Sequence, residues 1–456
     1  MTLRARKKST TTNGSYQMKC LGKLLSQSAL LIFFLIGLYC PAGAQGEVKI
    51  GVILPLSGRL ESTGREMRQA FELAAETANR EIPGLSMTIA RWQGIPGLGG
   101  AKVKLLFGDH RSDPARGADV AARFIREDEV AGILGCYNST VTKSVSEVCE
   151  KAKVPMFTAT SKAQNLTTQG NRWFWRTTPN NLSIDRYFFY FLKALTEGKA
   201  GMPYRIPLEE IREIVLLGED SDMGDQFLSR ISRLGSGYGF KIPLSVRYPR
   251  NSEGFSIQAR AAARAKPGVL ALISQTADAV KYIKTFKELG LSPRVIWGRS
   301  MAFRDVSFGE SLKEDALGVL TGAEFIPALF KSLPLARDIN NLYRKKTGKD
   351  MDGVAARAFT GLQAFLHVLD KAGSKDVKAI QSAANGLEMP ASELILPWRG
   401  IRFGGEQQNE RGQNVLGAGL VAQWQSAMES GVPALEIVYP PQFATADLIY
   451  PFPGWE

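Results

Sequence analysis

The sequence predicts an α/β protein with two doubly wound lobes, each built on a mostly parallel sheet. Short apolar runs alternate with segments whose apolar residues recur at helical spacing, and this series occurs twice along the 456 residues. Hydrophobic residues make up 44% of the chain and charged residues 22%, which is the composition of an ordinary globular protein. Strands that alternate with helices form βαβ units, in which successive strands pair in parallel.

The first series supplies four expected strands. They lie at Val48–Leu54, Lys102–Asp109, Ala131–Gly135 and Val154–Thr158. After the first strand, Phe71, Ala74, Ala75 and Ala78 have the spacing of one apolar helix face. This series therefore predicts the first lobe.

The second series begins after Thr178-Pro179. Its expected strands are Glu213–Glu219, Phe240–Tyr248, Gly268–Ser274 and Arg294–Gly298. A long helix is expected at about 353–371 and a last strand at about 415–424. The Pro- and aromatic-rich tail is expected to pack as extended chain on a surface.

Residues 1–44 have the features of a secretory signal peptide. Six Lys or Arg and no acid precede an apolar run from Ala29 to Tyr39, and Ala42-Gly43-Ala44 provides small residues before a cut after Ala44. A start at Met18 instead of Met1 gives a more usual signal length. A retained membrane anchor is the alternative, but about 20 apolar residues are needed to span a bilayer. We therefore expect a periplasmic protein.

Removal of this segment weakens the case for a nucleic-acid partner. The formal net charge falls from +13 to +7, because 51 basic residues remain against 44 acidic ones. The basic residues are scattered among acidic ones, and no basic stripe alternates with aromatic residues. We expect no nucleic acid as a partner.

The exported chain keeps two cysteines, Cys136 and Cys149. Cys149 lies about ten residues along an expected helix, or roughly 15 Å from its start, whereas Cys136 precedes that helix. A disulfide needs Cα atoms within about 7 Å. Two buried free thiols are therefore favoured over a pair.

Few residues suit catalysis. The chain has only two histidines, His110 and His367, and neither belongs to a metal or nucleophile motif. The acidic cluster Glu219-Asp220-Ser221-Asp222 follows a strand, where acids also suit the first turn of a helix. The sequence predicts no enzyme activity, no metal and no cofactor.

Two loops predict an anion-binding edge instead. Cys136-Tyr137-Asn138-Ser139-Thr140 follows the third strand, and Thr158-Ala159-Thr160-Ser161-Lys162 follows the fourth. In open α/β sheets, ligands bind beyond the carboxyl ends of the strands. Hydroxyl groups and free N–H groups at a helix start suit a carboxylate, although Asn138 or Ser139 alone is equally consistent with a helix cap.

The mature chain resembles the leucine/isoleucine/valine-binding family of solute-binding proteins, which serve ATP-driven importers. The matching segments are IGVILPLSGRLESTG, GDHRSDPARGADVAARFI, GILGCYNST, PMFTATSKAQNLT, FWRTTPNN and the C-terminal FGGEQQNERGQN with YPPQFATADLIYP. The resemblance implies a type I periplasmic binding protein with a three-crossing hinge near Thr178, Gly322 and Gly404. It implies a first lobe of residues 45–178 plus 324–404 and a second of 179–323 plus 405–456.

The resemblance also implies ligand-binding positions, with several departures. Ser139 and Thr160 match positions that bind the ligand carboxylate, and Lys162 replaces a threonine for which Ser161 is a neighbouring substitute. Thr63, Met223 and Thr276 stand where aromatic residues are common. The acid that holds an α-ammonium group belongs near Arg299-Ser300-Met301, where this sequence has none. Ser300 occupies the site, and Asp220, Asp222 and Asp278 are alternative acids.

We therefore expect a monomeric solute-binding protein that delivers a small carboxylate-bearing solute to the permease of an ABC importer. A branched-chain or other apolar amino acid is the leading ligand. The alternatives are an amide, a urea or an aromatic carboxylate on the same scaffold, or a sensory ectodomain. A DNA-binding repressor of related architecture lacks support, because a signal replaces the N-terminal helix-turn-helix.

Overall fold

A computed structural model describes residues 46–198, 205–251, 254–404, 411–426 and 432–455. The expected signal peptide and its cleavage point lie outside these residues. One compact unit begins at Glu47 and holds both sheets described below. Within the described ranges, every helix is too short or too polar to cross a membrane.

The first sheet has five parallel strands in the order β2-β1-β3-β4-β5. Their bounds are β1 Glu47–Leu54, β2 Lys102–Asp109, β3 Ile133–Gly135, β4 Met156–Thr158 and β5 Phe174–Arg176. The four expected strands are present, although β3 and β4 are each two residues shorter at the start. The fifth strand, β5, was missed because Arg172 and Arg176 enclose its short apolar run, whereas β3 and β4, of equal length, lie within longer expected strands.

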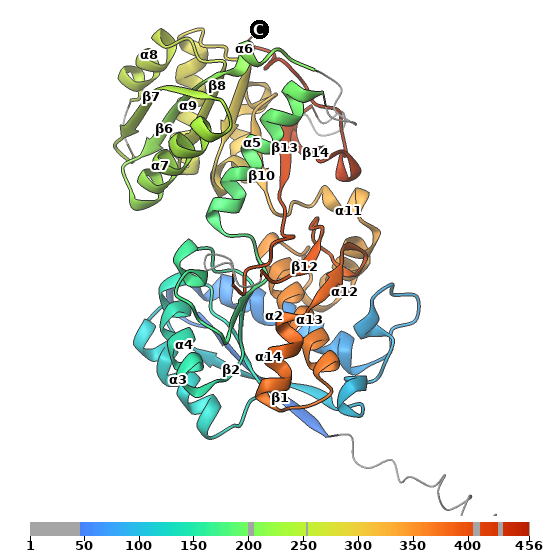
Figure 1. The fold of residues 1–456 in the computed structure, drawn as a ribbon. Helices are drawn as coiled ribbons and strands as arrows, with labels where there is room; N and C mark the ends of the chain where they lie inside the picture. Colours follow the sequence, from blue (N-terminus) through green and yellow to red (C-terminus); the bar gives the residue numbers. More distant parts are fainter. Residues whose placement is uncertain (1–45, 199–204, 252–253, 405–410, 427–431, 456) are drawn as a thin grey trace, which may run out of the picture. The chain divides into compact units, whose positions relative to one another are not determined.

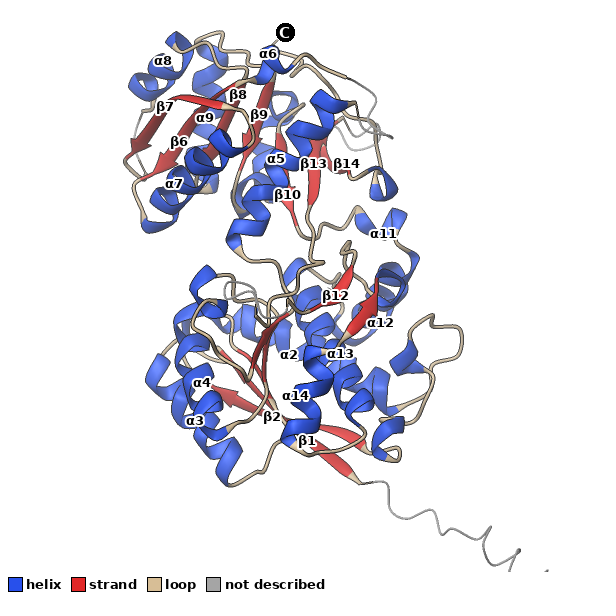
Figure 2. Cartoon of the chain, viewed as in Figure 1, coloured by secondary structure: helices blue, strands red, loops and turns tan. Residues whose placement is uncertain are grey.

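Helices cover both faces of the first sheet (Figures 1 and 2). They are α2 Glu61–Asn79, α3 Pro114–Arg126, α4 Ser139–Ala152, α12 Pro334–Thr347, α13 Gly353–Ala372 and α14 Val377–Asn385. Alternate residues of β1 divide between the faces: Ile50 and Val52 pack with α2 and α13, whereas Ile53 packs with α3 and α4. The strand is therefore apolar throughout, as a doubly covered parallel strand must be.

The second sheet has seven strands in the order β14-β13-β10-β9-β8-β6-β7. Their bounds are β6 Glu213–Glu219, β7 Lys241–Tyr248, β8 Val269–Ile273, β9 Val295–Gly298, β10 Leu320–Ala323, β13 Leu420–Gln425 and β14 Ala434–Tyr439. The first five are parallel, and β13 and β14 add an antiparallel edge. The expected last strand exists but runs antiparallel and starts five residues later.

Helices again cover both faces of this sheet (Figure 2). They are α5 Asn181–Glu197, α6 Leu208–Ile211, α7 Asp222–Gly237, α8 Ser256–Arg264, α9 Thr276–Glu288 and α10 Val306–Leu312. Leu216 packs with α5 and α7 on one face, and Leu217 packs with α8, α9 and α10 on the other. The prediction of two doubly wound lobes is confirmed.

Late segments of the chain return to both lobes, as the colours of Figure 1 show. α11 Leu329–Ser332, α12, α13, and the hairpin of β11 Glu388–Pro390 with β12 Gly400–Arg402 belong to the core of the first lobe. The C-terminal tail packs on the second lobe as expected: Ile449 N–H donates to Gln423 Oε1 at 2.8 Å, and Trp455 Nε1 donates to the Leu291 carbonyl at 2.9 Å.

Both cysteines are buried free thiols, as predicted. Burial raises the pKa of each thiol well above its usual range. Cys136 and Cys149 both pack among the apolar side chains between the first sheet and the pair α3–α4.

Candidate functional site

The residues singled out in the sequence all follow the carboxyl ends of parallel strands. In the first lobe Thr63 lies in the first turn of α2, Ser139 begins α4, and Thr160 and Ser161 follow β4; in the second, Met223 lies in the first turn of α7, Thr276 begins α9, and Ser300 follows β9. Each lobe thus places its own set at the sheet edge where α/β proteins bind ligands.

Ser139 and Thr160 leave polar groups unused. Ser139 Oγ accepts the Ala163 N–H at 3.3 Å, which leaves the hydroxyl proton without an acceptor among the described residues. Thr160 is 5% exposed, and its Oγ1 has no hydrogen-bond partner in the described part of the chain. The N-cap of α4 is Asn138, whose side chain does not cap the helix. Ser139 is therefore not the cap, and donors at this helix start remain available to an anion.

Ser161 has a different role from the one expected. Its side chain is buried, with Oγ 2.6 Å from Thr142 Oγ1 and 3.1 Å from the Tyr137 carbonyl, to which it donates. The hydroxyl proton of Ser161 is donated to this carbonyl, because a carbonyl oxygen can only accept a hydrogen bond. Ser161 therefore joins the two hydroxyl-rich loops to each other, and its place as a ligand-binding residue stays a prediction.

Lys162 belongs to a buried ion cluster beside this loop. It pairs with Glu324, which follows β10, and Arg357 Nη1 of α13 lies 3.0 Å from the same carboxylate oxygen. Thr178 Oγ1 donates to the other Glu324 oxygen at 3.2 Å. Burial alone would raise the pKa of Glu324, but the charges of Lys162 and Arg357 lower it to about 2. The Lys162 side chain is 26% exposed, and burial lowers the pKa of its ammonium group to about 7 against the opposing charge of Glu324.

The position where an acid for an α-ammonium group was expected is occupied by Arg299, and its guanidinium group is paired with an acid of the same lobe. Arg299 Nε lies 2.9 Å from Asp185 Oδ1, and Arg230 Nε lies 2.5 Å from Asp185 Oδ2. Ser300 Oγ donates to the Ser274 carbonyl at 2.8 Å. An ammonium group would require a carboxylate at this position. The residues present there are Ser300, whose hydroxyl proton is already donated, and Arg299, which is itself a cation.

The three alternative acids lie on other loops of the second lobe, and their part in holding an ammonium group stays a prediction; Asp278 Oδ1 is buried without a hydrogen-bond partner in the described part of the chain. Asp220 is 61% exposed and pairs with Arg247, and Asp222 is exposed at the start of α7. Asp278 is buried in the first turn of α9, where one oxygen accepts the Asn251 N–H at 2.9 Å. The first two acids suit the positive end of a helix, which is the structural explanation of the acidic cluster.

Thr63, Met223 and Thr276 stay predictions. Met223 is 45% exposed, and the two threonines are partly exposed. None of the three brings an aromatic ring to the site, so apolar contact with a ligand would come from Met223 alone among them.

Hydrogen bonds link the loop Thr158–Lys162, called here the carboxylate loop, to the segments of chain that pass from one lobe to the other. Buried Arg176 donates to the Gln413 side chain at 2.6 Å and to the Ala163 carbonyl at 2.5 Å, and the Asn181 N–H donates to the Lys162 carbonyl at 3.1 Å. The third crossing, expected near Gly404, stays a prediction. Asn414 still bonds to the Thr177 carbonyl at 3.0 Å, and the second sheet resumes only at β13.

A hollow of about 350 Å³ lies beside this link. It is lined from the first-lobe side by Gln164, from the passage by Asn181 and from α7 by Asp225, Gln226, Ser229 and Arg230. Both lobes therefore border open space next to the candidate site.

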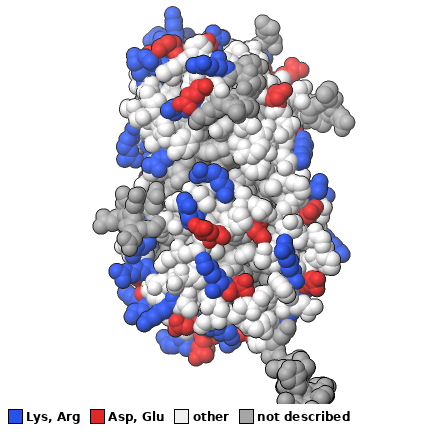
Figure 3. Space-filling model, turned by 45° about the vertical axis from the view of Figure 1, so that its right-hand side comes forward, with Lys and Arg blue, Asp and Glu red and all other residues white. Residues whose placement is uncertain are grey.

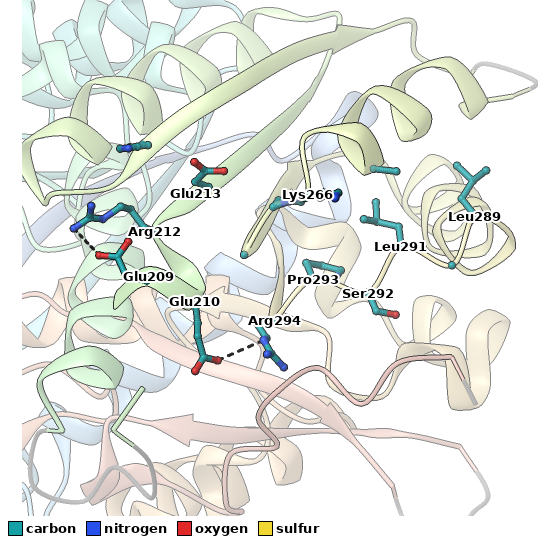
Figure 4. Close-up of a pocket in the computed structure, with 15 residues that line it drawn as sticks. Glu209, Glu210, Arg212, Glu213, Lys266, Leu289, Leu291, Ser292, Pro293 and Arg294 are labelled. Atoms are coloured by element: carbon teal, nitrogen blue, oxygen red, sulfur yellow. Dashed lines mark ion pairs between the residues drawn. The ribbon is translucent and has the colours of Figure 1, made fainter. Parts of the chain in front are cut away.

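A second hollow, of about 610 Å³, lies at the opposite edge of the second sheet (Figure 4). It is lined by residues at the amino ends of β6 to β9, among which Arg212 pairs with Glu209 and Arg294 with Glu210. This wide, polar surface is on the wrong edge for a ligand trapped by two α/β lobes.

Neither histidine suits a catalytic or metal site. His110 is buried, its Nδ1 accepts the Ser112 N–H at 2.9 Å, and burial lowers its pKa to about 4. His367 lies 4.0 Å from Glu393, and burial lowers its pKa. The described residues contain no group of three side chains placed to hold a metal ion.

The sequence interpretation missed the buried acids Asp185 and Glu324. Glu324 lies in an otherwise apolar segment, which is the signal that could have found it, because an isolated buried acid requires a cationic partner; Asp185 stands beside Arg186 and gives no such signal. Sequence alone does not identify that partner: Glu324 is 162 residues from Lys162 and 33 from Arg357.

Comparison with known proteins gives the family. A family model described as "Periplasmic binding protein" matches residues 47–428. The chain belongs to this family. Among curated members, Leu/Ile/Val-binding protein homolog 7 of Brucella abortus (strain 2308) is 24% identical over 413 residues, which covers 90% of this chain and 96% of the relative. The resemblance found in the sequence is confirmed.

Solved structures of periplasmic binding proteins confirm the fold. The branched-chain amino acid transporter substrate-binding protein of Streptococcus pneumoniae, in complex with isoleucine, has a TM-score of 0.58 and 18% identity over 86% of this chain and all of its own. An ABC transporter solute-binding protein of Rhodopseudomonas palustris BisB5, in complex with 3,4-dihydroxybenzoic acid, has a TM-score of 0.60 and 18% identity over 89% of this chain and 98% of its own.

Proposed function

We propose that this periplasmic binding protein captures a small carboxylate-bearing solute and delivers it to the membrane permease of an ATP-driven importer. The observation that carries the proposal is the edge of the first lobe, where Ser139 keeps a free hydroxyl proton and Thr160 Oγ1 is buried without a partner. A carboxylate accepts such donors in charge-assisted hydrogen bonds. The importer is inferred from relatives that serve ABC transporters.

Among carboxylates, the geometry favours a solute without an α-ammonium group. The two solved relatives bind isoleucine and a dihydroxybenzoic acid, yet each is 18% identical to this chain, so identity does not choose between them. The residues support the solute without an ammonium group, because Arg299 stands where that group needs an acid. Of the alternatives of an amide, a urea or an aromatic carboxylate, this favours the aromatic carboxylate over the leading expectation of an apolar amino acid.

The solute can be identified from the protein itself. Protein purified from the periplasm and denatured should release a carboxylate detectable by mass spectrometry, and isothermal titration calorimetry of the refolded protein should show one-site binding of that compound. A released solute without a carboxylate, bound at one site, would contradict the proposal.

Export is part of the same proposal and concerns residues outside the described ranges. Cleavage after Ala44 should yield a mature form that begins at Gln45. N-terminal sequencing of the exported protein tests this, and retention of residues 18–40 would favour the membrane-anchored alternative.

A further inference from the structure

Buried charges gather at the facing edges of the two lobes, and most of them are neutralised within the protein. Glu324 forms ion pairs with Lys162 and Arg357, and Asp185 forms ion pairs with Arg230 and Arg299. Each acid is therefore paired with two basic side chains, although burial lowers the pKa of one of them, Lys162, to about 7.

Arg304 is the exception in this region. It ends the 3₁₀ turn η5, Met301–Arg304, which follows β9 directly. One guanidinium nitrogen donates to Met301 Sδ at 2.9 Å, and Nε is buried with no acceptor in the described part of the chain. Among the described residues, no Asp or Glu lies within ion-pair distance of Arg304, unlike Arg230, Arg299 and Arg357.

An unpaired, partly buried guanidinium is unfavourable unless another group supplies the acid. Burial lowers the pKa of Arg304 to about 10, against the opposing charge of Glu324, so the group stays charged at neutral pH. Arg304 also acts electrostatically on Lys162, which places it near the carboxylate loop of the first lobe. Buried cations in proteins are paired or hydrogen-bonded.

We propose that Arg304 binds a second acidic group of the solute, so that the ligand is a diacid. One carboxylate lies at the loops of Ser139 and Thr160 in the first lobe, and a second carboxylate, or an equivalent sulfonate or phosphonate, lies on the Arg304 fork in the second. The planar guanidinium suits such a group because it donates two parallel hydrogen bonds. This inference rests on the proposed function and narrows its solute class.

Matched acids of equal length test the class. Calorimetry on ligand-free protein compares glutarate, pentanoate and L-norvaline, then adipate, hexanoate and L-norleucine, and finally terephthalate and benzoate. In at least one set the diacid should bind ten-fold or more tightly than its partners. A monoacid or amino acid that binds as tightly as the diacid in the best-bound set overturns the inference and leaves the proposed function standing. Absence of binding by every acid at 5 mM counts against the proposed function itself.

Variants test the residue. Arg304→Gln should weaken the diacid by about 10- to 100-fold and change monoacid affinity less than about two-fold, whereas a structural role would weaken both equally. Arg260→Gln, the same change at an exposed position of α8, should leave both affinities unchanged. If Arg304→Gln does not fold, Arg304→Lys is the alternative variant. It keeps the positive charge and should retain part of the diacid preference. Equal loss for diacid and monoacid in a folded Arg304 variant overturns the assignment.

Discussion

Ser139 combines two hydrogen-bonding roles in one hydroxyl group. Its oxygen accepts the Ala163 N–H from the neighbouring loop, while its proton is free for a ligand. Both roles depend on the start of α4, which the sequence predicted at this residue. Loss of the hydroxyl should therefore have two measurable consequences, one for stability and one for affinity.

Ser139→Ala should weaken binding of the released solute by about 10- to 150-fold, because a hydrogen bond to a charged group contributes about 1.5–3 kcal/mol. Loss of the bond to Ala163 should lower the free energy of unfolding by only about 1 kcal/mol. Titration calorimetry and urea denaturation measure the two effects.

Ser144→Ala is the matched control, because Ser144 lies on the same helix and is partly exposed. It should change neither quantity appreciably. A Ser139→Ala protein that is less stable yet binds as tightly as the parent would show that Ser139 only joins the two loops.

His110 should make the fold sensitive to mild acid. Its Nδ1 accepts the Ser112 N–H, and burial lowers its pKa from 6.5 to about 4. Between these two values the unfolded chain binds a proton that the folded protein excludes, so stability is complete above about pH 6.5 and falls as the pH drops toward 4. The loss should not exceed about 1.4 kcal/mol per pH unit.

Urea denaturation at pH 5 and pH 7 measures this loss, and His110→Gln should reduce the difference between the two pH values. His367→Gln, which removes the other histidine, should keep most of it. An unchanged pH difference in His110→Gln would assign the effect to other groups.

At the scale of elements, the sequence predicted whatever depends on local pattern. Buried strands such as β1 and β6 are continuous apolar runs, and α13 was expected within one residue of its observed end. The strand β5 was missed because Arg172 and Arg176 enclose its short apolar run. The antiparallel direction of β13 was missed because direction depends on the preceding connection and not on the strand's own residues.

The residues of the candidate site also differ in whether local sequence could predict them. Ser139 and Thr160 follow strands and were found from local sequence, whereas the partners of Lys162 and Arg299 come from distant segments. α13 is one such segment, since it carries Arg357 and packs beneath the carboxylate loop. A Cβ added at Gly361 of α13 would lie 2.5 Å from Ala159 Cβ, so only glycine permits this approach without movement.

Gly361→Ala should therefore destabilise the protein by about 1–3 kcal/mol, the usual cost of overpacking. It should also weaken solute binding, because the loop that moves carries Thr160. Gly237→Ala near the end of α7 has no atom within 4 Å of the new Cβ and should be neutral or slightly stabilising. Denaturation midpoints of the two variants compare them directly, and equal midpoints would mean that the loop and α13 adjust without cost.

At the scale of the whole molecule, charge and connection both bear on function. Basic and acidic side chains are interspersed over the face drawn in Figure 3, which agrees with the expectation of a solvated surface and gives no basic stripe there. In the groups of Glu324 and Asp185 the charges are paired within the protein, whereas the partly buried Arg304 lacks an acid within ion-pair distance among the described residues. A small anion is therefore better matched to this protein than a polyanion.

The connection between lobes predicts motion. The passages are short, and Arg176, Gln413 and Asn414 hydrogen-bond them to the first lobe. A solute held by Ser139 on one side and Arg304 on the other would add a link between the lobes to those of the hinge and of α11, where Lys331 pairs with Glu436 at 2.5 Å, so binding should favour a closed arrangement. Small-angle X-ray scattering should give a smaller radius of gyration with saturating solute than without it. Ser139→Ala at the same solute concentration should compact less, in proportion to its lower occupancy. An unchanged radius for the parent protein, with occupancy verified by calorimetry, would mean that the solute binds to one lobe without closing the other over it.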